Sequence, residues 1–394
     1  MYKNTRSHGF RGRKNRPGPG FRSNLSGRYI NPARFINKPV DSTMEEEYVP
    51  KFSFSNFNLK ENLLQNVLKK GYKNPTPIQD QTIPPIMAGR DVIGIANTGT
   101  GKTAAFLIPL INSMHTDGQL KALVVAPTRE LALQIRDEFT TFTEGSNLSS
   151  VLIIGGTNIQ RQEGRLRRDY NIIIATPGRL LDLVKRNSIN LSRFTKIVLD
   201  EVDRMLDIGF IYDVKRIISY LPKMRQSLFF SATIGRREEE IVGSFVSDPI
   251  KIEIVRRETA ETVEQDIVRV QPPLTKLDVL HDILIQEDVK KVLIFGRTKW
   301  GVDKLSKRLA ERGFKAGTIH GGKSQGHRQS ILEAFREDKI KILTATDVAS
   351  RGIDVDNITH VINYDPPETW EDYIHRIGRT GRANKRGKAL TFLD

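Results

Sequence analysis

Several features are missing from this sequence, and each absence excludes a class of protein. There is no cysteine, which excludes a disulfide framework and a zinc site built on thiolates. No apolar run approaches the roughly 20 residues of a membrane-spanning helix. Met1 is followed by basic and polar residues rather than by the apolar core of a signal peptide. We therefore expect a soluble, cytoplasmic protein.

Acidic residues are absent from positions 1–40, which carry ten Lys and Arg. These ten charges make up most of the net charge of +16, and residues 41–394 carry the remaining +6. Such an excess predicts a polyanionic partner. Residues 1–50 are rich in Gly, Arg, Asn and Pro and poor in apolar residues, so we expect a disordered basic tail. A purely solubilising role for this tail stays open.

What the sequence does contain is a repeated alternation of short apolar strands with helical segments. It occurs twice, over residues 51–254 and 265–394, and predicts two α/β domains in tandem. Each should have a mostly parallel sheet with helices on both faces. A charged stretch at 255–264 is the expected linker. The expected strands are 91–95, 122–126, 151–154, 172–175, 197–199, 228–230, 250–254, 292–295, 316–319, 342–344, 361–363 and 389–392.

The stretch Ala96–Thr103 ends in Gly-Lys-Thr and lies between an apolar strand and a helical run. This is the context that a phosphate-binding loop requires. Glycines let the backbone curl so that its N–H groups surround an anion. Lys102 can reach the terminal phosphates, and the Thr103 hydroxyl can hold a magnesium ion. The residues expected to bind the nucleotide here are Thr98, Gly99, Thr100, Gly101, Lys102 and Thr103.

Two adjacent acids, Asp200 and Glu201, follow the expected strand at 197–199. Ligands bind at the carboxyl ends of strands in a parallel sheet, so these acids should lie beside the phosphate loop. Asp200 is the expected second magnesium anchor. Glu201 is positioned to orient and deprotonate an attacking water. Both residues are therefore candidate catalytic groups for phosphoryl transfer.

The stretch His375–Arg382 places three arginines within eight residues, interrupted by glycines. The second domain has no phosphate loop of its own. Arginines aimed at the nucleotide of the first domain would complete that site and stabilise charge on the transferring phosphoryl group. Solvated surface charge is the alternative interpretation.

Taken together and in order, the motifs of this chain resemble those of the DEAD-box RNA helicases over about residues 50–394. Val202 stands where the family name has alanine, and we expect activity to survive because both carboxylates remain. The resemblance implies two RecA-like domains, with ATP, Mg²⁺ and RNA bound across the cleft of a monomer. The matching motifs are Gly71–Gln79, Ala96–Thr103, Pro127–Leu131, Thr176–Arg179, Asp200–Asp203, Ser231–Thr233, Thr346–Asp354 and His375–Arg382.

The resemblance also implies individual roles. Phe54 and Tyr72 support the adenine ring, and Gln79 reads its edge, which favours ATP over GTP. The residues implied to grip or support the RNA backbone are Thr128, Arg129, Gly156, Thr176, Gly178, Arg179, Arg297, Gln325, Arg328, Thr346 and Gly352. The residues implied to complete or couple the site are Asp354 at the ribose, Arg379 and Arg382 as arginine fingers, and Ser231, Thr233, His375 and Arg376.

The favoured interpretation is therefore RNA-stimulated ATP hydrolysis, coupled to domain closure and to local, non-processive opening of short duplexes or remodelling of RNA–protein complexes. The basic tail should contact the same RNA. Two alternatives stay open on the sequence alone. One is a DNA translocase, and the other is an ATP-dependent RNA clamp that does not unwind, because a clamp needs the same residues.

Overall fold

The computed structural model describes residues 31–37, 48–97, 99–254, 263–347, 355, 357–381 and 387–393. Four of the predicted site residues, Thr98, Gly352, Asp354 and Arg382, lie outside these ranges, as do most of the basic tail and most of the expected linker. Among the helices of the described residues, none has the length and apolar character needed to cross a bilayer.

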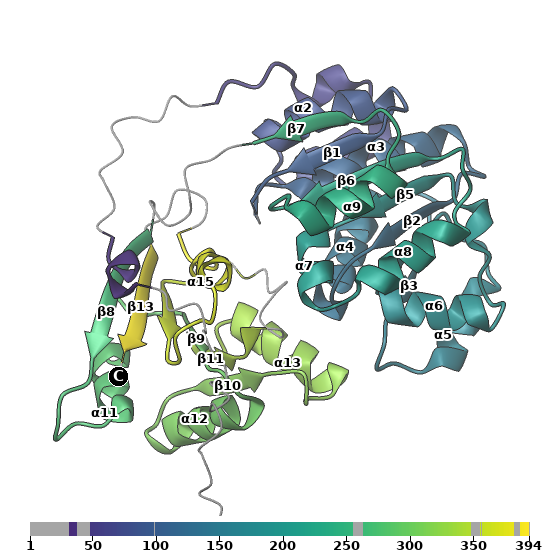
Figure 1. Cartoon of the computed structure of the whole chain (residues 1–394). Coiled ribbons are helices and arrows are strands. Elements are labelled where there is room, and N and C mark those ends of the chain that lie inside the picture. Colours follow the sequence, from purple (N-terminus) through teal and green to yellow (C-terminus); the bar gives the residue numbers. More distant parts are fainter. Residues whose placement is uncertain are drawn as a thin grey trace, which may run out of the picture.

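The first domain is organised around a seven-stranded sheet with the order β3-β4-β2-β5-β6-β1-β7 (Figure 1). Every pair of neighbouring strands in it is parallel. Its strands are β1 (Val92–Ile95), β2 (Ala122–Val125), β3 (Ser150–Ile153), β4 (Ile172–Ala175), β5 (Lys196–Leu199), β6 (Gln226–Ser231) and β7 (Ile250–Glu253).

Both faces of this sheet are covered by helices. Alternate strand residues enter opposite cores: Val92 and Val124 pack with helices α1 to α4, whereas Ile93 and Val125 pack with α6 to α9. The helices are η2 (Phe54–Phe57), α1 (Glu61–Lys69), α2 (Pro77–Met87), α3 (Lys102–Thr116), α4 (Arg129–Phe142), α5 (Ile159–Leu166), α6 (Pro177–Lys185), η3 (Leu191–Arg193), α7 (Val202–Asp207), α8 (Ile211–Tyr220) and α9 (Arg236–Phe245).

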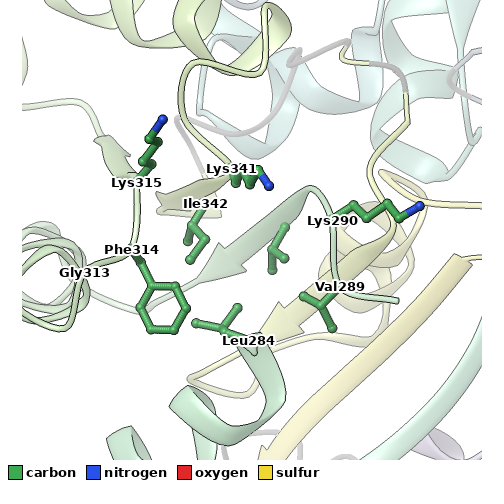
Figure 2. Close-up of a pocket in the computed structure, with 9 residues that line it drawn as sticks. Leu284, Val289, Lys290, Gly313, Phe314, Lys315, Lys341 and Ile342 are labelled. Carbon is green, nitrogen blue, oxygen red and sulfur yellow. The ribbon is translucent and has the colours of Figure 1, made fainter. Parts of the chain in front are cut away.

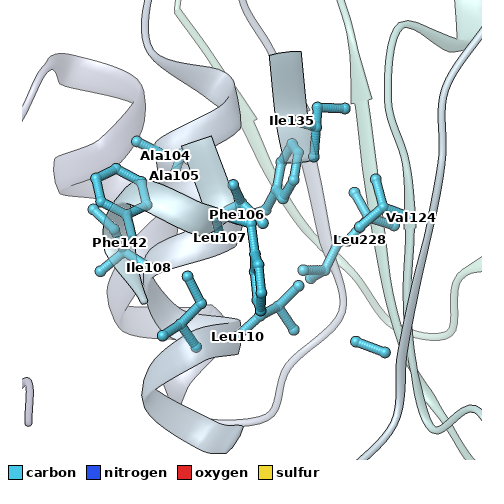
Figure 3. Close-up of a cluster of buried hydrophobic side chains, with 14 of the residues drawn as sticks. Ala104, Ala105, Phe106, Leu107, Ile108, Leu110, Val124, Ile135, Phe142 and Leu228 are labelled. Carbon is cyan, nitrogen blue, oxygen red and sulfur yellow. The ribbon is translucent and has the colours of Figure 1, made fainter. Parts of the chain in front are cut away.

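Helix α3 is the centre of the first core. Its residues from Ala104 to Ile111 are all buried, so the helix is apolar on every side, as expected for an element enclosed by other elements. Figure 3 shows its side chains, including Phe106 and Leu110, among Ile135, Val124 and Leu228. This packing fixes the start of α3, and therefore fixes the loop that precedes Lys102.

The second domain has a six-stranded sheet with the order β10-β11-β9-β12-β13-β8, again with parallel neighbours. One core lies under α13 and another under α11 and α12, so both faces are covered here too. The elements are β8 (Val263–Arg269), α11 (Lys276–Leu284), β9 (Val292–Phe295), α12 (Lys299–Glu311), β10 (Ala316–Ile319), α13 (Gln325–Arg336), β11 (Ile342–Ala345), β12 (His360–Asn363), α15 (Trp370–Ile377) and β13 (Gly387–Leu393).

Two predictions need correction. Strand β8 was not predicted, and its residues Val263 and Glu264 fall in the expected linker. An edge strand carries charges on its exposed positions, here Glu264 and Asp266, and these hide the apolar alternation. The tail prediction is wrong for residues 31–37, where η1 (Pro32–Phe35) forms and Phe35 is buried. Phe35 and the backbone of Asn37 dock this segment on the second domain.

Candidate active site

The phosphate loop has the geometry that its sequence predicts. Gly99 and Gly101 have φ values of 81° and 91°, in the left-handed region that favours glycine. Lys102 is the first residue of α3 and is buried. Its ammonium donates a hydrogen bond to the carbonyl oxygen of Ala96 at 2.7 Å. The loop therefore holds its cation inside the turn, and Thr103 follows in the first turn of the helix.

Gln79 is hydrogen-bonded to the phosphate loop. Its Oε1 accepts from the backbone N–H of Thr76 at 2.9 Å, and its Nε2 donates to the carbonyl oxygen of Gly101 at 3.1 Å. The Thr76 hydroxyl donates to the carbonyl oxygen of Thr100 at 2.8 Å. A Cβ atom on Gly101 would clash with Gln79 Nε2. The start of α2 and the phosphate loop are therefore one packed unit.

The two aromatic residues expected at the adenine ring are stacked on each other. The rings of Phe54 and Tyr72 have centroids 6.1 Å apart and planes 18° apart. The Tyr72 hydroxyl donates to Glu138 Oε1 at 2.9 Å. Phe54 is only 1% exposed. Its ring therefore packs against Tyr72 from the side of the core and cannot itself contact a ligand.

Asp200 and Glu201 lie at the carboxyl end of β5 and are both buried. Burial raises the pKa of Asp200 to about 7, although the Lys102 ammonium acts against that rise. Burial acts in the same direction on Glu201, but the cations of Arg204, Lys102 and Arg379 outweigh it and lower its pKa. Glu201 also has a φ of 49°, which is unusual for a residue with a side chain.

The donor set fits a magnesium ion. A buried Asp200 carboxylate and the Thr103 hydroxyl supply the oxygen ligands that Mg²⁺ prefers, with phosphate oxygens and water completing such sites. The oxygen chemistry and the burial therefore agree with the predicted metal residues.

Sequence reasoning assigned no separate role to two residues near these acids, Arg204 and Asp203. Arg204 Nη1 lies 2.6 Å from Glu201 Oε2, a pairing that the i, i+3 spacing could have indicated. Asp203 joins two strand ends, because its Oδ2 accepts from the N–H of Ala232 at 3.1 Å and its N–H donates to the Ser231 hydroxyl at 3.2 Å. Ser231 is thus tied to the acidic motif, whereas Thr233 is exposed.

Val202 is fully buried in the core on the α7 side of the sheet. Its packing partners include Met205 and Phe229. The position therefore faces the packing of the sheet. The neighbouring carboxylates keep their places in the site.

In the second domain, Arg376 is fixed by three partners. It binds Asp347 with Nε and Nη2 at 2.5 and 2.7 Å, and its Nη1 donates to Asn363 Oδ1 at 3.1 Å and to the carbonyl oxygen of Asp365 at 2.8 Å. Its guanidinium also lies 5.0 Å from the centroid of the Phe295 ring. Asp347, which sequence reasoning missed, is the main anchor of this arginine.

Arg379 lies just after α15 in the second domain. It is buried, and its Nε donates to the carbonyl oxygen of His375 at 3.2 Å. It is also one of the three cations that lower the pKa of Glu201. The role of Arg379 at the nucleotide of the first domain stays a prediction of the arginine motif.

The residues predicted to hold RNA in the first domain gather at adjacent strand ends. Thr128 caps α4 by accepting from the N–H of Leu131 at 3.3 Å. The Arg129 guanidinium packs on Gly156, so closely that a Cβ atom there would clash with its Nη1. Arg179 Nη1 donates to the carbonyl oxygen of Thr157 at 3.0 Å. Thr176 and Gly178 begin α6 in the same region.

Gln325 and Arg328 contact the first domain instead of standing free. Gln325 Nε2 donates to Glu130 Oε1 at 3.2 Å, and Arg328 Nη2 lies 2.9 Å from Glu130 Oε2. All three side chains are buried. Glu130, which sequence reasoning left without a role, is therefore an interdomain contact. Arg297 has an exposed side chain, and Thr346 is buried after β11.

A hollow in the second domain lies away from these residues. It has a volume of about 280 Å³ and an apolar floor that includes Leu284, Val289 and Phe314, with lysines at its rim (Figure 2). Its lining residues Val292 and Ile342 begin β9 and β11, so it lies at the amino ends of the strands. The candidate site lies at the carboxyl ends.

Comparison with known proteins agrees with this geometry. Residues 76–241 match the DEAD/DEAH box helicase family, and residues 275–384 match the helicase conserved C-terminal domain. The chain is 44% identical over 343 residues to the ATP-dependent RNA helicase CshA of Listeria monocytogenes, and 42% identical to the DEAD-box ATP-dependent RNA helicase CshA of Bacillus subtilis. These matches cover 86% of this chain, and 66% and 69% of those proteins.

Solved structures give the same result. Saccharomyces cerevisiae Dbp5 bound to RNA and ADP BeF3 matches with a TM-score of 0.76 at 29% identity, covering 86% of this chain and 89% of that one. A DEAD box protein from Methanococcus jannaschii matches with a TM-score of 0.52 at 39% identity, covering 88% and 94%. From its two matched domains, its relatives and its fold, this chain belongs to the DEAD-box helicase family.

Proposed function

We propose that this chain is an ATP-dependent RNA helicase, which hydrolyses ATP to ADP and phosphate when RNA is bound. The observation that carries the proposal is the buried group of Lys102, Asp200 and Glu201 at the phosphate loop and the end of β5, in a domain that contacts the second through Glu130. Membership of the DEAD-box family supports the same function.

Each side chain has a distinct part in the chemistry. Lys102 pairs with the terminal phosphates. Asp200 and Thr103 would hold Mg²⁺, which would supply positive charge to neutralise the phosphate oxygens. The Glu201 carboxylate is kept ionised by its three cations, so it can accept a proton from the attacking water. Arg379 stabilises the transferring phosphoryl group, and Arg204 keeps Glu201 in place.

Adenine selectivity is assigned to Gln79 with Tyr72. Gln79 is held at both ends of its amide by Thr76 and Gly101, so the direction of its donor and acceptor is set before a nucleotide arrives. Guanine presents an acceptor where adenine presents an amino donor. A fixed amide therefore favours ATP over GTP.

RNA binding is assigned to side chains that grip a sugar–phosphate backbone. Arg129 and Arg179 lie beside Gly156 in the first domain, and Arg297 is exposed in the second. Contacts to phosphates carry no base information, so binding should not depend on sequence. The basic tail adds charge of the right sign for the same partner.

Closure of the two domains couples RNA to hydrolysis. Support comes from the contacts of Glu130 with Gln325 and Arg328. Because the grip on RNA is shared between the domains, each opening and closing should separate only a short stretch of duplex.

The test is ATPase activity with and without RNA, comparing wild type with Glu201→Gln. Wild type should be stimulated by RNA, whereas Glu201→Gln should bind ATP and RNA but turn over roughly a hundredfold or more slowly, because its water is not activated. Near-normal turnover of the variant would refute the assigned base. Equal stimulation by DNA would favour a translocase, and wild type without strand displacement would favour a clamp.

A further inference from the structure

The described part of the basic tail is docked on the second domain. Residues Asn31–Asn37, here called the N-terminal arm, form the single turn η1 and insert Phe35 into a small core. Phe35 is 2% exposed, and its ring centroid lies 4.7 Å from that of Tyr373 in an edge-on contact and 6.5 Å from that of Trp370. Figure 1 shows this turn beside β8.

The backbone of the arm is fixed to the same place. Asn37 exchanges two hydrogen bonds with Gln265, at 3.0 and 2.8 Å, on the edge strand β8. The side chain of Gln265 in turn accepts a hydrogen bond from the Tyr373 hydroxyl at 2.8 Å, in a buried position. One residue of the edge strand therefore links the arm to α15.

Helix α15 is the helix that places the arginines. Tyr373 and Ile377 belong to the core that receives Phe35, together with Val263 and Ala389. Three residues after Tyr373, Arg376 is held by Asp347. Arg379 follows the helix directly and is hydrogen-bonded to the carbonyl oxygen of His375 in its last turn. Any shift of α15 is therefore a shift of Arg379.

The next described residues, from Tyr48 on, belong to the first domain and lie close to the residues expected to bind the nucleotide. The Tyr48 hydroxyl donates to Asp80 Oδ2 at 2.5 Å, and the N–H groups of Lys51 and Phe52 donate to the same carboxylate. Asp80 follows Gln79 in α2. Ten residues separate Asn37 from Tyr48, and a chain of that length spans at most about 40 Å. The arm is thus joined to the first domain by the intervening residues and held on the second domain by packing and hydrogen bonds.

We propose that the N-terminal arm is a positioning element for the arginine helix, with Phe35 as its anchor, and that it acts through the position of Arg379. Phe35 touches no residue of the nucleotide site among those that the structure describes, so it acts through α15. The inference rests on the proposed ATPase function, because the arm is expected to change the position of Arg379 and therefore the rate of ATP hydrolysis.

The test compares variants of the full chain. Phe35→Ala should lower kcat at saturating RNA by roughly tenfold, the size of a misplaced catalytic contact, while the affinity for a nonhydrolysable ATP analogue without RNA stays at the wild-type value. Ile36→Ala is the matched control, since Ile36 is 56% exposed next to the anchor. Phe35→Leu should restore most of the missing kcat. Deleting residues 1–30 keeps the arm and should leave kcat unchanged, whereas deleting 1–37 should reproduce Phe35→Ala.

A distance measurement separates positioning from general stability. The chain has no cysteine, so Tyr212→Cys in α8 and Arg308→Cys in α12, both exposed positions, give specific labelling for energy transfer between the domains. Phe35→Ala should lower the closed fraction seen with RNA and the ATP analogue. A Phe35→Ala protein with wild-type kcat and closed fraction overturns the proposal, as does an equal loss of analogue affinity without RNA. If wild type itself lacks RNA-stimulated turnover, the proposed function fails first.

Discussion

The two halves of the candidate active site are built in different ways. In the first domain, the site residues bond to one another: Lys102 to the loop carbonyl of Ala96, Gln79 to Gly101, and Glu201 to Arg204. In the second domain, the site residue is an arginine carried by α15, whose position depends on contacts made elsewhere. Nucleotide binding should therefore belong to the first half, and turnover to both.

The largest effect is expected from a substitution in the half of the site that lies in the first domain. Lys102→Ala removes the cation that pairs with the terminal phosphates, so both ATP binding and RNA-stimulated turnover should be abolished. Lys185→Ala, an exposed substitution in the same domain, is the control. Measured ATP affinity and ATPase rate should fall together, and a variant that retains both would remove Lys102 from the site.

Breaking the second half should separate turnover from binding. Arg379→Ala should reduce RNA-stimulated turnover by roughly a thousandfold or more, the usual worth of an arginine finger, while ATP-analogue affinity without RNA changes little. Arg308→Ala on α12 is the exposed control. Arg382→Ala is expected to behave in the same way. Single-turnover kinetics would decide, and an equal fall in affinity and rate would contradict the division between the halves.

The contact between the two domains can be weakened without substituting a residue of the nucleotide site. Glu130→Gln removes the charge that faces Arg328, so the closed state loses a buried ion pair. RNA should tighten ATP-analogue binding, and the analogue should tighten RNA binding, by the same factor. In the variant that factor should fall roughly tenfold. Asp137→Asn on the same helix is exposed and is the control. If the affinities of wild type for RNA and for the ATP analogue do not depend on each other, the domain-closure mechanism is wrong.

The next prediction concerns how the first domain distinguishes adenine from guanine. Gln79→Ala should reduce discrimination of ATP over GTP by roughly tenfold, the order of one well-placed bidentate contact. It should also weaken binding of both nucleotides, because the Gly101 carbonyl loses its partner. Hydrolysis rates measured at sub-saturating ATP and GTP test this. Equal rates in wild type would mean that Gln79 does not read the base.

The smallest effect on turnover is expected from the tail. Deleting residues 1–30 removes eight Lys and Arg and no acid, so RNA affinity should fall. The slope of log affinity against log salt should flatten by about 0.7 for each phosphate of a single strand that the tail no longer neutralises. The ATPase rate at saturating RNA should stay close to wild type. A salt slope that does not change returns the tail to a solubilising role.

The sequence predicted the sheet and the chemistry where one short motif was sufficient. Gly99, Gly101 and Lys102 are local in the chain, and their left-handed backbone follows from glycine alone. The partners that come from far away could not be predicted. Asp347 pairs with Arg376 only once the fold has placed β11 and α15. Glu130 pairs with Arg328 only when the two domains are in contact.

Edges were the other weak point of prediction. Strand β8 alternates buried Val263 and Gln265 with exposed acids, so its composition resembles that of a linker. Phe35 is a single aromatic residue in a basic stretch, and its partners Tyr373 and Trp370 lie more than three hundred residues away. Composition describes a segment as a whole and therefore misses one anchoring side chain.

The bond between Gln79 and Gly101 limits how this enzyme could evolve a different base preference. Replacing Gln79 alone would leave the Thr76 N–H and the Gly101 carbonyl without their present partners, and a larger residue at 101 would strike Gln79. The two positions are therefore epistatic. A change from adenine to another base requires coordinated substitutions in α2 and in the phosphate loop, and each single intermediate would bind nucleotide less well than the parent.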